Sequence, residues 1–474
     1  MFDKINKLEP KVTFIFKIMY LLLTLFSFNN LTVYTSGLRI AALFMMIFGC
    51  SIILYRILHI RKYIQSIGAT LLALFLLSYV FSSFMNMSYG VVENIKALVW
   101  MTILFVVVYL TDQNTTKELL IRELKIIHVV TLVYITMMNI VGIIMFFLDF
   151  GYEFGRNGLG VHYGWLIGRL MGMYSDANYM AVISCVSLVV AFYLLILNRN
   201  LWVRITLLFS SVVNVIYIAL SDSRTGLVAL ACTTFVLAFL LLKRSSQLIN
   251  RKPFSRLFLS FVIAFILMLV SFGAIQLVLE GARLYKSDVG REVSTATLFI
   301  ASTSEITTEV GRELPNNDIT TGRLGIWGSA IDLFQSSPIF GVSFRNILAY
   351  AEVNTPDTFI LNNDMTNFPN MHNLLLDVLV SQGIIGIVIF LILVVYLIIF
   401  VLKGIHQSKE IDYFVLCIGL STLVPIVVST MFYSEILFIN TSGSVLFWLT
   451  LGAITRYLMI ILRGESHDTK EIIS

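Results

Sequence analysis

The stretch "NFPNMHNLLLDVLVSQGIIGIVIF", residues 367–390, passes from polar residues into a long apolar segment, and this segment decides the fold. His372 lies in the polar part, just before the apolar residues begin. An apolar run of about 18 residues or more is typical of a helix that crosses a membrane. Backbone groups in lipid must bond within the protein, and a continuous rather than alternating apolar run favours a helix over a barrel strand. We therefore expect a membrane helix with a histidine at its mouth.

The rest of the chain has the same apolar character. Of its 474 residues, 58% are hydrophobic and 13% are charged, and the mean hydropathy is +0.88. Soluble domains carry about one quarter charged residues, so an assembly of soluble domains is excluded. The apolar runs predict an all-α polytopic integral membrane protein with about twelve transmembrane helices. The predicted spans are 12–29, 37–55, 64–84, 95–111, 126–148, 177–197, 202–220, 225–242, 257–279, 373–402, 411–431 and 442–462.

The basic residues predict the orientation of these spans. With the N-terminus inside, the inner segments hold 22 of the 33 Lys and Arg residues. Six of the other basic residues fall in one long loop, where the positive-inside rule does not apply. Both termini are therefore expected in the cytoplasm. The modest net charge of +5 then reflects topology, and nucleic acid is not an expected partner.

One large extracytoplasmic loop, residues 280–371, is predicted between the ninth and tenth spans. It divides the chain into helices 1–9 (1–279), the loop, and a final part (372–474) with three helices and a cytoplasmic tail. Loops of this length are usually functional or disordered. Within it, "TTGRLGIWGSAIDLFQSSP" predicts an amphipathic helix over about 321–336, with Thr320 or Thr321 as N-cap. Its expected apolar face, directed toward the membrane or the bundle, consists of Ile326, Trp327, Ala330, Ile331 and Phe334.

Charged and polar residues gather at helix mouths on the predicted outer face. Ionisable groups at membrane depth are costly and are functional candidates. Arg169, Asp176 and Asn178 precede the sixth span, Asp222, Ser223 and Arg224 form the hairpin after the seventh, and His372 and Asn373 open the tenth. Arg323 on the amphipathic helix would add another cation to the same face. Because these residues come from separate segments, their convergence indicates a site.

Each residue also has a plainer interpretation. Arg224 and Asp222 could form only a salt bridge within the hairpin, and Arg169 could extend to lipid headgroups. His372 could be an ordinary interfacial histidine, and Asn373 a helix cap. Ser223 could act as a nucleophile with His372 as its base, although no G-x-S-x-G motif surrounds it. The argument for a site depends on the set of residues and not on any one of them.

A lipid-linked diphosphate and an acceptor hydroxyl suit this set of residues. Guanidinium groups bind phosphate oxygens in pairs and keep their charge, so Arg169, Arg224 and Arg323 would hold the diphosphate. His372 can accept a proton near neutral pH and would act as the general base. Asp176 and Glu435 are the next candidates for that base. No clustered Asp, Glu and His residues have ligand spacing, so neither a metal nor a cofactor is predicted.

These motifs resemble the bacterial O-antigen ligase and polymerase superfamily. The resemblance covers about 165–390 and consists of a Ser-Arg step at a helix mouth, a long outer loop, and a histidine-asparagine pair followed by spaced leucines and two glycines. The matching residues are Arg169, Gly172, Asn178, Ser223, Arg224, Arg323, Trp327, Pro338, Gly341, His372, Asn373, Leu376, Leu379, Gly383 and Gly386. Ser343 stands where the family often has glycine, and Asp377 where it often has glutamate.

The resemblance implies a glycosyltransferase in the cytoplasmic membrane of a bacterium. It would move a glycan from an undecaprenyl-diphosphate-linked donor to an acceptor on the outer face, with other polysaccharide assembly proteins as candidate partners. A polymerase of O-antigen, capsule or exopolysaccharide is the preferred interpretation, and a ligase with a different acceptor is the alternative. A transporter of lipid-linked oligosaccharide is the main alternative of another class, and a non-catalytic sensor or scaffold is a third. A transporter would favour charges near mid-membrane and similar halves, which the sequence does not show.

Overall fold

The computed structural model describes residues 2–156, 159–166, 168–245, 248, 252–296, 322–363 and 368–464. It is mostly helical, as predicted. The helices are α1 (Phe2–Ser27), α2 (Ser36–Leu58), α3 (Ala69–Met85), α4 (Val92–Thr102), α5 (Lys117–Phe147), α6 (Ala177–Leu197), α7 (Leu201–Leu220), α8 (Arg224–Lys243), α10 (Pro253–Ala296), α11 (Arg323–Ser336), α12 (Ile347–Asn354), α13 (Leu374–Gln407), α14 (Glu410–Ser429) and α15 (Ser442–Leu462). Shorter turns are η1 (Ile60–Lys62), η2 (Met87–Tyr89), η3 (Ile103–Tyr109), which continues α4 as a π-helix, and η5 (Phe344–Asn346).

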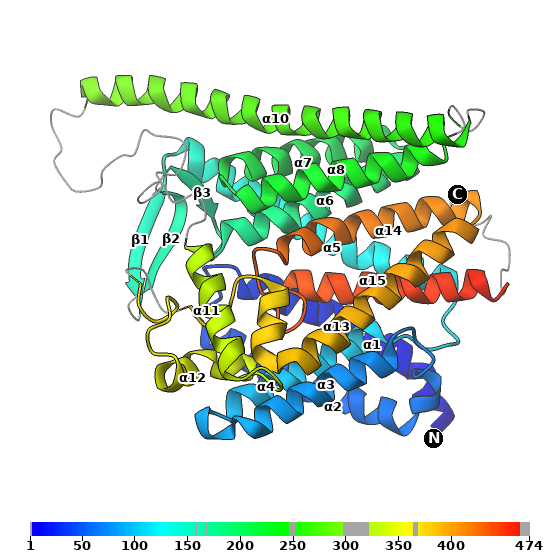
Figure 1. Ribbon diagram of the computed structural model, residues 1–474. Coiled ribbons are helices and arrows are strands. Elements are labelled where there is room, and N and C mark those ends of the chain that lie inside the picture. Colours follow the sequence, from blue (N-terminus) through cyan, green and yellow to red (C-terminus); the bar gives the residue numbers. More distant parts are fainter. Residues whose placement is uncertain are drawn as a thin grey trace.

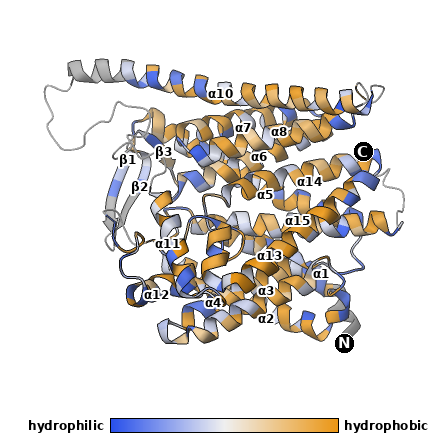
Figure 2. Ribbon diagram, viewed as in Figure 1, coloured by the Kyte–Doolittle hydropathy of each residue, from blue (hydrophilic) through white to orange (hydrophobic). Residues whose placement is uncertain are grey.

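Within the described residues, eleven helices are long and apolar enough to cross a membrane. The shorter apolar helix α3 corresponds to a twelfth predicted span, so every predicted span has a helix at its position. Figure 2 shows the hydrophobic residues along the bodies of these helices and hydrophilic residues at many of their ends. The chain is therefore a polytopic helical membrane protein, and the exact number of spans and their orientation stay predictions.

The helices form a bundle with α15 near its centre, where most residues of α15 are buried. Helix α13 packs against α3, and α10 lies across α7 and α8 (Figure 1). The start of α1 and the end of α15 lie at one end of the bundle, whereas the three strands, α11 and α12 lie at the other (Figure 1). The side of the membrane on which each end of the bundle lies stays a prediction. Helix α10 continues past the predicted span end at 279 to Ala296.

A three-stranded antiparallel sheet, which the sequence interpretation did not include, lies between α5 and α6. Its strands are β1 (Gly151–Arg156), β2 (Leu159–Leu166) and β3 (Arg169–Gly172), in the order β1-β2-β3. Gly164 pairs with Gly151 on one side and with Gly172 on the other. Strand β3 packs against α5 and leads into the start of α6, so the sheet fixes Arg169 close to that helix mouth.

Helix α13 is broken at Gly383, where φ is 62° and ψ is −158°. The chain after α11 fills this break with its own backbone. Val342 N donates to Val380 O at 2.8 Å, and Ile384 N donates to Pro338 O at 2.8 Å. Non-helical backbone at membrane depth is tolerated where the protein itself satisfies it. Gly341, with φ of 69°, contacts the backbone of this break, which explains why glycine occupies both positions.

Helix α11 begins at Arg323 after Gly322, whose φ of 79° is suited to glycine. The predicted caps Thr320 and Thr321 lie outside the described residues. The predicted apolar face is only partly correct. Ile331 is 53% exposed, and the buried side toward α13 consists of Ile326, Ser329, Ala330 and Leu333. The buried face of α11 is therefore shifted by about one residue toward its N-terminus relative to the predicted face. Its members recur every three or four residues from Ile326, as expected for a helix that packs on α13 along one side.

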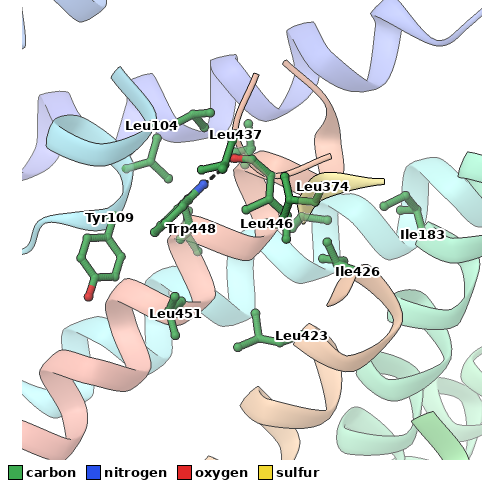
Figure 3. Close-up of a cluster of buried hydrophobic side chains, with 14 of the residues drawn as sticks. Leu104, Tyr109, Ile183, Leu374, Leu423, Ile426, Leu437, Leu446, Trp448 and Leu451 are labelled. Atoms are coloured by element: carbon green, nitrogen blue, oxygen red, sulfur yellow. Dashed lines mark hydrogen bonds between the residues drawn. The ribbon is translucent and has the colours of Figure 1, made fainter. Parts of the chain in front are cut away.

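A buried core lies where α13, α15 and the α14–α15 loop (residues 430–441) meet. Among the described residues, Trp448 is the largest fully buried side chain, and its Nε1 donates to Ile436 O at 2.6 Å (Figure 3). Figure 3 shows Leu374, the first residue of α13, close to Leu446 and Leu437 in this core. Because Ile436 anchors the α14–α15 loop in this core, the loop residues just before Ile436 and the first turn of α13 are held in fixed positions.

Candidate functional site

His372 lies in a tight turn that its neighbours hold from both sides. Its φ is 48°, an uncommon value for a residue with a side chain. The backbone N–H of His372 donates to Asn370 Oδ1 at 3.1 Å, and that of Met371 donates to Asp377 Oδ1 at 2.8 Å. Asn373 caps α13, with its Oδ1 accepting from Leu375 N at 3.0 Å and Leu376 N at 3.2 Å. Strained backbone that is held this firmly is often found at functional sites.

Two aromatic rings flank the half-buried imidazole of His372. The ring of Phe368 lies 5.8 Å away and that of Tyr433 6.2 Å away, both edge to face. Burial lowers the pKa of His372, and the Arg323 guanidinium lowers it further, whereas the Asp176 carboxylate raises it. The net direction is downward, so the imidazole is neutral near neutral pH. A neutral imidazole can accept a proton, which is the requirement for a general base.

Arg323 is the first residue of α11, and its guanidinium lies 5.4 Å from the centroid of the Phe432 ring. A cation at this distance is attracted by the face of an aromatic ring. The contact connects α11 to the α14–α15 loop. It also brings a permanent positive charge close enough to His372 to affect the pKa of the imidazole.

The start of α6 brings a second arginine to the same end of the bundle. Asp176 caps the helix, accepting from Asn178 N at 2.9 Å and Tyr179 N at 3.1 Å. Arg169 is 7% exposed, and its Nη2 donates to Asn178 Oδ1 at 3.0 Å while its Nε donates to Ser221 O at 3.1 Å. Arg169 therefore connects β3, α6 and the α7–α8 hairpin through fixed bonds rather than extending to lipid headgroups.

The α7–α8 hairpin carries the remaining predicted residues. Ser223 is buried and caps α8, with its Oγ accepting from Gly226 N at 2.9 Å. This role accounts for Ser223 without a nucleophilic step. Asp222 adopts φ of 46°, which turns the chain sharply between the two helices. Arg224 is exposed at the first position of α8. It lies three residues after Ser221, whose carbonyl oxygen accepts from Arg169.

The α14–α15 loop joins these elements, and the sequence interpretation did not assign it a role apart from Glu435. Met431 O accepts from Asn373 Nδ2 at 3.3 Å, and Ser434 Oγ donates to Asp377. Phe432 lies beneath Arg323, and Tyr433 lies between His372 and Asn178. Four consecutive residues thus contact the mouth of α13, the start of α11 and the start of α6. Their signal in the sequence was weak, because aromatic residues are common wherever a helix meets the membrane surface.

Glu435 follows this group and is 2% exposed. Burial raises the pKa of its carboxyl to about 8, the Asp176 carboxylate acts in the same direction, and a hydrogen bond from Ser429 opposes both. A carboxyl with that pKa is mostly protonated near neutral pH. Glu435 therefore suits the role of a general base less well than His372 does. In the part of the chain that the structure describes, no three His, Cys, Asp or Glu side chains gather in a way that could hold a metal ion.

The structure thus places His372, Arg323, Asp176, Asn178 and Arg169 around Tyr433, close enough for their charges to act on its hydroxyl or on His372. Arg224 lies on the adjacent hairpin. Asn373 and Ser223 act as helix caps in this conformation. The roles assigned to these residues in binding and catalysis stay predictions.

The fold and this site define a polytopic membrane protein with a histidine and several arginines at the mouths of its helices. Residues 209–391 match a family model described as O-antigen ligase. The match includes Ser223, Arg224, Arg323, His372 and Asn373, and it confirms the predicted resemblance to the O-antigen ligase and polymerase superfamily. It also supports an enzyme of that superfamily. No curated protein matches the chain.

Proposed function

We propose that this protein is a polysaccharide polymerase that works on the outer face of the bacterial cytoplasmic membrane. Its donor would be an undecaprenyl-diphosphate-linked glycan, and its acceptor a sugar hydroxyl on a second glycan. The observation that carries the proposal is the position of His372, which is held in a strained turn within reach of the Arg323 charge, at the end of the bundle that holds α11 and the sheet. The family match supports the same class of reaction.

The chemistry needs one proton transfer and one displacement. His372 takes the proton of the acceptor hydroxyl as the hydroxyl oxygen bonds to the anomeric carbon of the donor sugar. The bond between that carbon and the diphosphate oxygen breaks, and its electron pair leaves with the undecaprenyl diphosphate. Arg323, Arg169 and Arg224 stabilise the charge that develops on this leaving group. Attack on the face opposite the leaving group inverts the anomeric centre.

The transporter alternative receives one structural argument, which is the break in α13, since transporters often build substrate sites from discontinuous helices. Here the break is filled by residues 338–343, whose backbone bonds directly to Val380, Ser381 and Ile384. The backbone groups exposed by the break are therefore used within the protein. A transport path through this point would have to displace that segment, so the break favours a structural role.

The first experiment replaces His372 with alanine in the purified protein. General-base catalysis is typically worth 10²–10⁴-fold, so we expect turnover to fall by about that factor while donor binding is retained. His406→Ala is the matched control, because His406 is exposed near the other end of the same helix. Turnover of His372→Ala close to that of the control would exclude the general-base role.

A second experiment separates polymerase from ligase in the producing cell. The chain length and attachment of the surface glycan are compared with and without the gene. Loss of long chains, with single repeat units still attached to lipid or acceptor, supports the polymerase. Accumulation of finished polymer that is not joined to its acceptor supports the ligase instead.

A further inference from the structure

Tyr433 is the residue on which the separate parts of the site converge. Its ring contacts His372, its hydroxyl lies beside the Asn178 amide, and Arg323, Arg169 and Asp176 are all close enough to influence its ionisation. The ring of the neighbouring Phe432 contacts the Arg323 guanidinium. The sequence interpretation gave Tyr433 no role, and the proposed reaction does not yet use it.

The bonding of Asn178 determines what the Tyr433 hydroxyl can offer. Arginine has no acceptor, so the Asn178 atom that receives the Arg169 bond at 3.0 Å must be the carbonyl oxygen. The amide NH₂ of Asn178 is not used by Arg169 and can donate to Tyr433. The bond between these two side chains lowers the pKa of the phenol, as a bond donated to the phenol oxygen does. A hydroxyl that accepts from this amide keeps its own proton for another partner.

The hydroxyl keeps that proton at ordinary pH. Burial raises the pKa of Tyr433 above its usual value, and the Asp176 carboxylate adds to the effect, against smaller opposing contributions from Arg323, Asn178 and Arg169. Among the residues that the structure describes, no side chain or carbonyl accepts a hydrogen bond from the Tyr433 hydroxyl. The half-buried Tyr433 thus presents a proton donor within reach of the charges of Arg323 and Arg169.

We propose that Tyr433 is a further binding residue of this site, whose hydroxyl donates to a phosphate oxygen of the lipid diphosphate held by Arg323 and Arg169. The inference rests on the proposed function, because it takes the diphosphate as the ligand. Two cations and one neutral donor suit an anion whose oxygens point in several directions. The purely structural alternative is that only the aromatic ring matters, as an edge contact that keeps the His372 imidazole in place.

The test uses Tyr433→Phe in the full-length protein, because this change removes the hydroxyl and retains the ring. The probe is undecaprenyl diphosphate, and undecaprenol, which lacks the anion, is measured in parallel. A hydrogen bond to a charged group contributes enough that its loss weakens affinity about tenfold or more. We expect that loss for undecaprenyl diphosphate, with unchanged binding of undecaprenol. Tyr396→Phe is the matched control, because Tyr396 is an exposed tyrosine on α13 that lies 24 residues after His372.

Arg323→Ala, measured beside it, separates two kinds of failure. If Arg323→Ala weakens diphosphate binding and Tyr433→Phe does not, the inference is overturned and the proposed function stands. If neither change affects diphosphate binding, the diphosphate site itself is wrong, and the proposed function fails together with the inference. If Tyr433→Phe weakens the binding of undecaprenol equally, the hydroxyl does not recognise the anion, and the inference is again overturned.

Discussion

Replacing Gly383 with alanine tests the link between the broken helix and the site. The backbone at Gly383 lies in a region that is essentially restricted to glycine, and placing alanine there costs about 1–3 kcal/mol. The new methyl group would also meet the carbonyl of Ile339 and, at 2.8 Å, the backbone N of Gly341. Main-chain atoms cannot rotate away as a side chain can, and overpacking of this kind typically costs about 1–3 kcal/mol more. The expected total is about 2–6 kcal/mol.

The clash is relieved if the segment 338–343 moves away from α13. That movement breaks the hydrogen bonds from Val342 N to Val380 O and from Ile384 N to Pro338 O. That movement would shift α11, and with it Arg323, away from His372. We therefore expect Gly383→Ala to lower the unfolding temperature in detergent and to reduce turnover more than tenfold, even where the protein is still folded. The matched control is Gly273→Ala on α10, where no atom lies within 4 Å of the added methyl group. Wild-type thermal stability and turnover in Gly383→Ala would refute this explanation of the break.

Three further outcomes follow from the site. Arg323→Gln removes a charge that lowers the pKa of His372, so the pH below which kcat decreases should move upward. Asp176→Asn removes a charge that raises the pKa of His372, so the same pH should move downward. Shifts in the same direction, or none, would contradict the assignment of His372 as the titrating base. Arg224→Ala should reduce kcat/KM by about tens- to hundredfold, with only partial recovery in Arg224→Lys, because a point charge replaces a planar fork; normal activity in Arg224→Ala would remove this residue from the diphosphate site. Glu435→Gln should leave turnover near wild type close to neutral pH, since the carboxyl with a pKa of about 8 is already mostly protonated there, and a large loss would indicate that Glu435 handles protons.

The membrane helices could be predicted from the sequence because lipid requires a simple pattern. A segment in hydrocarbon must be apolar over the thickness of the bilayer, and this requirement leaves a continuous signal in the chain. The helix mouths were predictable for a related reason, since charged residues such as Arg169 and Arg224 stand out against apolar surroundings. His372 was identified in the same way, although its strained backbone and its two aromatic neighbours were not.

The features that the sequence interpretation missed depend on contacts between distant segments. Gly383 lies in a strongly apolar run that predicts an unbroken helix, and only the approach of Gly341 explains why the helix breaks there. The sheet of residues 151–172 lies between two spans and depends on packing against α5. Tyr433 and Phe432 have no motif of their own. Their position follows from α6, α11 and α13 meeting at one loop, which local propensity does not encode.

The charges around His372 give the proposed reaction an order. Without the donor, burial and Arg323 keep the imidazole neutral and make it a weak base. A diphosphate bound to Arg323 brings negative charge that offsets the guanidinium, and nearby negative charge raises the pKa of an imidazole. His372 therefore becomes a stronger base once the donor is in place. An acceptor hydroxyl that arrives first meets a poor base, whereas one that arrives second meets a better base and a leaving group already held by arginine. Arg323, which would bind the diphosphate and also lowers the pKa of His372, thus couples the arrival of the donor to the activation of the acceptor.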